Sequence, residues 1–183
     1  MKPTTHFMID LETMSTEPNA AIVSAACVEF DPYDTKLVTR LLYRAIDLDS
    51  CLNAGGVMDA STVTWWLQQS EDARMAVVFG DVMIEDFMVE LNEFIGHQAF
   101  DDGPLRVWAK PPSFDCVILR GYYSRLGHDD PNWGFRDERD VGTLLDITGI
   151  KASDFDRGTR HNALHDCHAQ IAAVQAAYQK LRT

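Results

Sequence analysis

The sequence contains few of the residues that cross-link a chain or anchor it in a membrane. It has four cysteines in 183 residues and no Cys-x-x-C pair, so neither a disulfide framework nor a zinc ribbon is expected. No apolar run is long enough to cross a bilayer, and the N-terminus lacks the charged, apolar and small residues of a signal peptide. These absences predict a protein of the reducing cytoplasm with no membrane partner.

Basic residues are also in deficit. Lysine and arginine number 16 against 28 aspartates and glutamates, which gives a formal net charge of -12. This charge argues against a broad grip on duplex DNA or RNA, which needs a basic face. It does not exclude an enzyme of nucleic acids, because a pocket that gathers carboxylates adds negative charge that bound Mg²⁺ reverses locally. Contact with such a substrate would be local, as at the end of a strand.

The apolar patterns predict strands first and then strands that alternate with helices. Strands are expected over residues 6–13, 21–30, 36–46 and 105–109, with a short fifth one within 133–141. The first three follow one another closely, which predicts an antiparallel meander. No repeat, low-complexity tract or long linker divides the chain, so residues 1–183 are predicted to form a single domain.

Helices are predicted where apolar residues recur at helical spacing after a capping residue. They begin after Ser61, at Ile84, after Ser113 and after Asn162, while residues 47–59, 96–103 and 151–160 are expected to be loops. Together with the strands, this order predicts an α/β fold in which a mixed five-stranded sheet is flanked by helices.

The first strand carries two acids. Residues 6–13 alternate, so Asp10 and Glu12 share one face of the strand while apolar residues share the other. Two neighbouring carboxylates repel each other and lose water on burial, and a bound divalent cation relieves both costs. An ordinary polar pattern on an exposed strand face explains the pair equally well. Acids elsewhere in the chain decide between the two interpretations.

Two further acids occur in the first turns of helices. Asp115 follows the strand at 105–109, and Asp166 lies near the start of the last helix. Each alone is explained by the favourable interaction of an anion with a helix N-terminus. The ends of adjacent strands and the helices beside them are, however, where a sheet gathers a functional site. The joint pattern predicts that these acids meet the pair on the first strand.

His161 extends this set if the last helix begins after it. On a continuous helix, residues five apart diverge by about 140°, so His161 and Asp166 converge only if His161 lies in the preceding loop. Asn162 is a suitable N-cap for that break. A competing interpretation places His161, His165 and His168 on one helix face as a zinc site. The cap signal and the oxygen-rich neighbourhood favour Mg²⁺ or Mn²⁺ instead.

At this point the chain resembles a known family. The segments I-D-L-E-T (9–13), S-F-D (113–115) and H-N-A-L-H-D (161–166) are similar to the three motifs of the DEDDh 3'-5' exonucleases, which have the ribonuclease-H-like fold. The segments T-V-T-W-W-L-Q-Q-S-E-D-A-R (62–74) and R-D-V (139–141) resemble the branch that contains phage oligodeoxyribonucleotide exonucleases and the mycobacterial exoribonuclease RNase AS. The resemblance covers essentially the whole chain.

The resemblance implies a metal-dependent 3'-5' exonuclease that releases 5'-mononucleotides from single-stranded DNA or RNA. It implies that Asp10, Glu12, Asp115 and Asp166 hold two Mg²⁺ ions, for which Mn²⁺ can substitute, and that His161 is the general base. The chemistry agrees, because two ions can hold a scissile phosphate and imidazole accepts a proton near neutral pH. A catalytically silent nucleic-acid-binding domain of the same fold is the alternative.

The resemblance also suggests substrate contacts, and the chain differs from the family pattern at one place. Related sequences often carry Asn-Gly ahead of S-F-D, where this chain has Lys110-Pro-Pro. Lys110 is a candidate phosphate contact, Met14 a candidate contact to the terminal nucleotide, and Trp66 a candidate stacking surface for a base. A solvated lysine, a turn or core methionine and a packed indole are the alternatives.

Other features of the family leave the substrate and the assembly open. Arg139 and Asp140 recur in the family signature and are interpreted as a brace or internal ion pair. Related enzymes are often dimers, which suggests a homodimer. The sequence does not distinguish DNA from RNA.

Overall fold

The computed structural model describes residues 4–34, 38–99, 103–128, 130–155 and 160–182. Its centre is a five-stranded sheet with the order β3-β2-β1-β4-β5. The strands are β1 (Thr5–Thr13), β2 (Ile22–Phe30), β3 (Val38–Ala45), β4 (Leu105–Ala109) and β5 (Glu138–Asp140). The first three are antiparallel neighbours, whereas β4 pairs in parallel with β1, and β5 with β4. The predicted meander and mixed sheet are confirmed.

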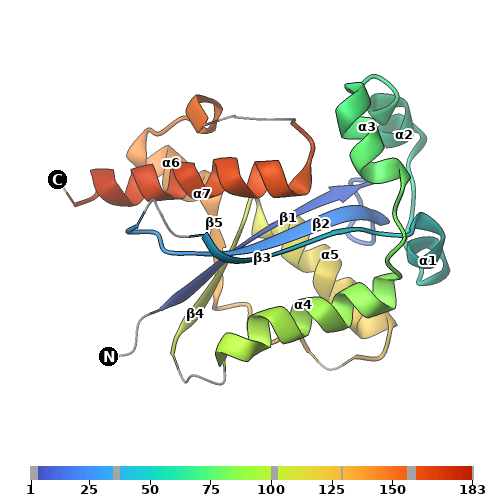
Figure 1. The fold of residues 1–183 in the computed structure, drawn as a ribbon, viewed down its shortest axis with the longest axis horizontal. Coiled ribbons are helices and arrows are strands. Elements are labelled where there is room, and N and C mark those ends of the chain that lie inside the picture. Colours follow the sequence, from blue (N-terminus) through green and yellow to red (C-terminus); the bar gives the residue numbers. More distant parts are fainter. Residues whose placement is uncertain (1–3, 35–37, 100–102, 129, 156–159, 183) are drawn as a thin grey trace.

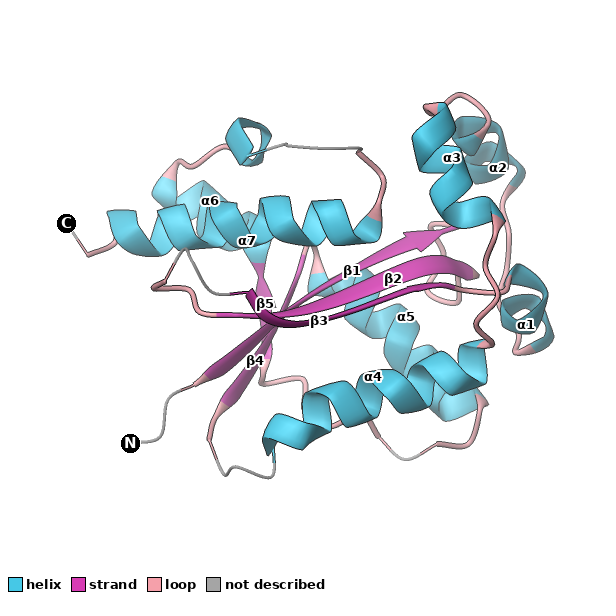
Figure 2. Cartoon of the chain, in the orientation of Figure 1, coloured by secondary structure: helices cyan, strands magenta, loops and turns pink. Residues whose placement is uncertain are grey.

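Helices cover both faces of this sheet (Figures 1 and 2). One face carries α6 (Val141–Thr148) and α7 (Ala163–Lys180), and the other carries α4 (Ile84–Ala99) and α5 (Pro112–Arg125). Three short helices, α1 (Leu48–Asn53), α2 (Ala60–Trp66) and α3 (Glu71–Val78), gather near the end toward which β1 points (Figure 1). A 3-10 helix, η1 (Ala152–Phe155), precedes α7.

The alternation of β1 is what places the acids. Phe7, Ile9 and Leu11 belong to the core cluster shared with α4 and α5. Met8 belongs to the cluster on the opposite face, where Cys167 and other residues of α7 pack. Since side chains alternate along a strand, the acids at positions 10 and 12 share the face of Met8. The predicted common face is therefore the one covered by α7.

The predicted loop at 47–59 is wrong, because it contains α1. Asp47 caps this helix, accepting a hydrogen bond from the Ser50 backbone N–H at 2.7 Å. Asp47 ends the apolar pattern of the third strand, and so short a helix has too few positions to show a period of its own. The loop at 151–160 likewise contains η1, while residues 156–159 lie outside the described part.

Two predicted caps and one predicted helix end also differ. Asp59, not Ser61, precedes α2, and α5 begins at Pro112 rather than after Ser113. Proline suits the first helical turn because its missing N–H would have no intrahelical partner there. Helix α4 continues through Gly96, where a Cβ would lie 2.2 Å from the Asn132 amide nitrogen. This glycine permits a close contact rather than ending the helix.

Two further findings concern the cysteines and the helices. All four cysteines are buried free thiols, in agreement with the absence of a disulfide framework. Within the ranges described above, no helix has both the length and the apolar character that a membrane span requires.

Candidate active site

Buried carboxyl groups meet where β1 reaches the start of α5. Glu12 on β1 is 8% exposed and Asp115 in the first turn of α5 is 3% exposed. The backbone N–H of Leu11 donates a hydrogen bond to Asp115 Oδ1 at 3.1 Å. Leu11 separates Asp10 from Glu12 on the strand. This bond therefore fixes α5 against the segment that carries both strand acids.

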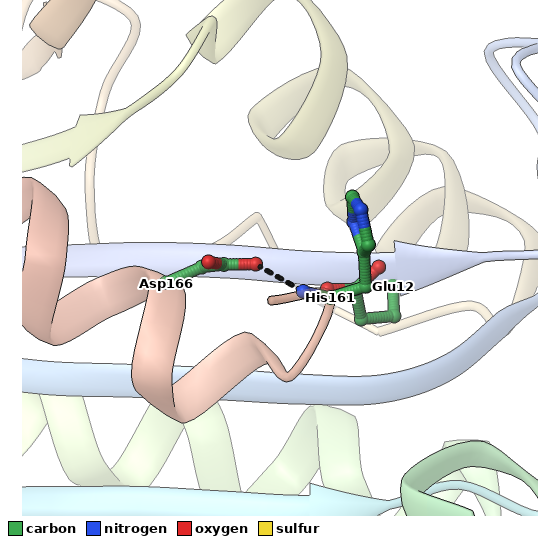
Figure 3. Close-up of side chains that lie close together, drawn as sticks. All are labelled: Glu12, His161 and Asp166. Carbon is green, nitrogen blue, oxygen red and sulfur yellow. Dashed lines mark hydrogen bonds between the residues drawn. The ribbon is translucent and has the colours of Figure 1, made fainter. Parts of the chain in front are cut away.

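The start of α7 brings the remaining predicted residues to the same place. Asn162 is the N-cap, and its side chain accepts a hydrogen bond from the His165 backbone N–H at 3.2 Å. His161 lies outside the helix with a left-handed φ of 62°, and its backbone N–H donates to Asp166 Oδ2 at 3.1 Å (Figure 3). The predicted break before α7 is confirmed. The zinc interpretation required His161 and His165 to share one face of a continuous helix, and the structure does not place them so.

Glu12, His161 and Asp166 form a cluster that could hold a metal ion (Figure 3). One ligand atom from each lies within 4.8 Å of the others. Asp10 and Asp115 belong to the same electrostatic group, because the pKa of Asp10 is raised first by burial and then by the charges of Asp115, Glu12 and Asp166. The structure thus brings together all five residues that the sequence motifs single out.

Burial is the main reason why these carboxyl groups hold their protons. It raises the pKa of Glu12 to about 8, with further contributions from the charges of Asp166 and Asp115. Burial raises the pKa of Asp115 to about 7, although the hydrogen bond from Leu11 opposes the shift. The cluster resists full ionisation unless positive charge is supplied.

The donor set fits hard divalent cations. Carboxylate oxygens are the ligands that Mg²⁺ and Mn²⁺ prefer, and four carboxyl groups provide them here. Gln170, on α7, supports this set: its Nε2 donates to Asp10 Oδ1 at 2.6 Å. The Gln170 Oε1 atom is buried, and none of the residues that the structure describes donates a hydrogen bond to it. Sequence reasoning missed Gln170, although it follows Asp166 by one helical turn and so shares its face.

Two cavities flank the acids. A cavity of about 470 Å³ is lined by Glu12, residues of the following turn, Phe114 on α5 and both tryptophans of α2. A cavity of about 350 Å³ is lined by Asp10, Asp166, His161, Gln170 and Lys110, among others. The carboxyl groups therefore lie between an aromatic cavity and a polar one.

The three predicted substrate contacts lie at different depths. Lys110 is exposed at the polar cavity, and its peptide bond to Pro111 is cis. Met14 is half-buried and packs against two apolar clusters. Trp66 lines the aromatic cavity but is only 4% exposed, and its indole N–H donates to the Thr13 carbonyl at 2.9 Å. Trp65, which is 39% exposed, presents the larger accessible surface to the cavity.

Arg139 and Asp140 brace the segment before α6. Asp140 is the N-cap of α6 and accepts hydrogen bonds from the backbone N–H groups of Gly142 and Thr143. The Arg139 guanidinium donates to the backbone carbonyls of Arg136 and Glu138. These contacts agree with the predicted brace.

The raised pKa values predict how metal-free stability depends on pH. Between about pH 4, where unfolded carboxyl groups ionise, and pH 8, the folded state retains protons that the unfolded state has released. The free energy of unfolding therefore falls as pH rises through this window. The melting temperature in EDTA is expected to fall by about 5 °C from pH 6.5 to 8.5, and Mg²⁺ should raise it more at pH 8.5.

The starting pH in that experiment keeps an opposing contribution small. Burial lowers the pKa of His6 to about 4, and most of its effect on stability is already present at about pH 6.5, where half of the unfolded imidazoles are neutral. A melting temperature in EDTA that rises between pH 6.5 and 8.5 would contradict the predicted proton retention.

Comparison with solved structures identifies the fold. E. coli exonuclease I in complex with a dA16 oligonucleotide matches with a TM-score of 0.66 and 15% identity, over 98% of this chain and 42% of that chain. The nuclease domain of 3'hExo, a DEDDh family member bound to rAMP, matches with a TM-score of 0.58 and 12% identity, over 96% and 92%. The chain thus spans about two fifths of exonuclease I. The predicted ribonuclease-H-like fold is confirmed: the chain has the fold of these nucleases.

Sequence comparison then gives the family. Residues 5–178 match the 3'-5' exoribonuclease Rv2179c-like domain, and the chain belongs to this family. The exodeoxyribonuclease of Enterobacteria phage T4 is 28% identical over 201 residues, which cover 93% of this chain and 88% of that protein. The resemblance drawn from the motifs is confirmed, and the protein is a 3'-5' exonuclease.

Proposed function

We propose that this protein is a metal-dependent exonuclease that removes 5'-mononucleotides from the 3' ends of single-stranded DNA or RNA. The observation that carries the proposal is the meeting of His161 with Glu12 and Asp166 at the edge of a buried carboxyl cluster. A structural cluster of acids has no need of an imidazole outside the helix at this point. A hydrolytic site needs a proton acceptor there.

The roles of the residues follow from their chemistry. Asp10, Glu12, Asp115 and Asp166 would hold two Mg²⁺ ions, or Mn²⁺ in their place. When bound, divalent ions polarise the phosphate and neutralise the charge that develops on the departing 3' oxygen. Before that, the acids must release the protons that burial retains. His161 would take the proton of the attacking water as general base.

The two cavities suit different parts of a strand end. The aromatic cavity, with the accessible Trp65 ring, suits the flat face of a base, and Met14 lies in the turn beside it. Trp66 would contribute a ring edge to this contact. The polar cavity carries Lys110, a cation suited to a backbone phosphate. Similar proteins support a nucleic-acid substrate: one relative is an exodeoxyribonuclease, and exonuclease I was solved with a DNA oligonucleotide.

One assay tests the activity and the choice of nucleic acid together. Matched DNA and RNA oligonucleotides labelled at the 3' end are incubated with the protein and Mg²⁺, and released mononucleotides are separated. We expect release that requires the metal and stops in EDTA. Binding of the oligonucleotide without release, in both Mg²⁺ and Mn²⁺, would favour the silent binding domain. The ratio of the two rates gives the preference for DNA or RNA, since a single contact to the 2'-OH can set it. A homodimer and a cytoplasmic location stay predictions.

A further inference from the structure

The imidazole of His161 lies against a pair of tryptophans. Its ring centroid is 4.7 Å from that of Trp65, with the planes at 80°, and 6.3 Å from that of Trp66, with the planes at 81°. The two indoles form an edge-to-face pair of their own, with centroids 5.1 Å apart. Edge-to-face contacts at these separations are attractive and directional. Three rings therefore form one aromatic corner beside Glu12.

This corner is attached to the strand that carries the acids. Trp66 is buried with Val23, Ala73 and Val77, and its indole N–H donates to the carbonyl of Thr13, the residue after Glu12. Helix α2 is thus fixed relative to the end of β1. Trp65 is next to Trp66 on α2 and is therefore held in place with it. Its ring contacts His161 from the side of the aromatic cavity.

The backbone of His161 restricts its side chain less than a helix would. Its N–H is bonded to Asp166, but the residue precedes the helix and has a left-handed φ. Its side chain therefore lacks the restriction that neighbouring turns impose inside a helix. The imidazole has to stay close to Glu12 and Asp166 if it is to accept a proton from water at the metal site. Trp65 is the accessible ring nearest to it.

We propose that Trp65 is a positioning residue that holds the His161 imidazole beside Glu12 and Asp166, so that α2 joins the aromatic cavity to the proton acceptor. The proposal rests on the function proposed above and deepens it. In a simpler role, Trp65 would only stack on the terminal base and would not act through His161. The two roles predict different kinetics.

A double-mutant cycle separates these roles. Trp65→Ala is expected to lower single-turnover cleavage of a saturating oligonucleotide about 10-fold, since a loosened catalytic group loses orientation. In a His161→Asn background the same change should have almost no effect, because the group through which Trp65 acts is gone. Trp65→Phe should restore most of the rate. If Trp65 only stacked on the base, Trp65→Ala would raise KM, leave kcat unchanged and have the same effect in both backgrounds.

Two controls complete the test. Phe79→Ala removes an exposed aromatic residue at the end of α3 and should leave the rate unchanged. An oligonucleotide with an abasic 3' residue removes the base, so the loss caused by Trp65→Ala should persist if the residue positions His161. The proposal is overturned if Trp65→Ala leaves kcat unchanged, or if its effect is as large in the His161→Asn background.

A spectroscopic measurement does not depend on cleavage. The carbon-bound protons of the His161 ring, assigned by their loss in His161→Asn, should show ring-current shifts that become clearly smaller in Trp65→Ala and persist in Phe79→Ala. If these shifts are seen in a protein that releases no mononucleotide, the proposed function fails while the contact stands. If wild type cleaves normally and Trp65→Ala does not move the signals, the positioning role fails alone.

Discussion

Replacing Asp10 by asparagine is expected to lower the rate of mononucleotide release by about 1000-fold or more, because a metal site of this kind supplies several kcal/mol of transition-state stabilisation. Asparagine has almost the size of aspartate, and its side-chain oxygen can still accept the hydrogen bond from Gln170. The loss would therefore reflect the missing charge rather than a collapsed site. Release of labelled mononucleotide at saturating Mg²⁺ measures it.

The same substitution is expected to affect stability in the opposite direction. Burial and the charges of Asp115, Glu12 and Asp166 raise the pKa of Asp10, so the metal-free protein at pH 8.5 should be at least as stable with asparagine at this position as with aspartate. Mg²⁺ should no longer raise the melting temperature appreciably. Asp146→Asn, on the exposed side of α6, is the matched control and should change neither quantity. An Asp10→Asn protein that keeps full activity would exclude Asp10 from the metal site.

Local patterns in the sequence were sufficient to predict the shared face of Asp10 and Glu12 and the position of His161 before α7. The alternation of β1 placed Asp10 and Glu12 on one face, and the structure puts that face under α7. The capping preference of Asn162 predicted that α7 begins after His161, which the cap hydrogen bond shows. Each inference concerned residues close together in the chain, where backbone geometry decides the outcome.

The parts that escaped prediction depend on contacts between distant segments. The contact between Trp65 and His161 joins residues almost a hundred positions apart, and no local pattern reports it. The hydrogen bond from Trp66 to Thr13 is equally remote, and it explains why Trp66, rather than Trp65, became buried. Gln170 was detectable in principle from its helical spacing to Asp166. Its role as a hydrogen-bond donor to Asp10 is seen only once the fold brings the two residues together.

Placing four carboxyl groups in one buried site lowers the stability of the metal-free fold, and this cost has a functional consequence. Because burial holds protons on Glu12 and Asp115, metal binding must displace them, so affinity for Mg²⁺ should increase with pH up to about pH 8. His161 contributes its imidazole from outside the helix, so the acids and the imidazole can be tested separately by substitution.

Replacing His161 by alanine or asparagine is expected to lower turnover by roughly 100-fold, the usual scale of general base catalysis, while Mn²⁺ affinity changes little. The two variants differ in the backbone. Alanine is strained at a φ of 62°, whereas asparagine tolerates the left-handed region, so a deficit shared by both belongs to the lost imidazole. Single-turnover rates measure the first quantity, and calorimetric titration with Mn²⁺ measures the second.

The titration also decides between two roles that the geometry allows, because the imidazole lies close enough to Glu12 and Asp166 to be a ligand itself. If His161 were a metal ligand, both variants would lose Mn²⁺ affinity along with the rate, and excess metal would restore activity. If it is the general base, excess metal restores nothing, whereas a stronger nucleophile than water in place of the activated water, such as hydroxylamine, recovers part of the rate. Normal turnover of His161→Asn at neutral pH would remove His161 from the reaction altogether.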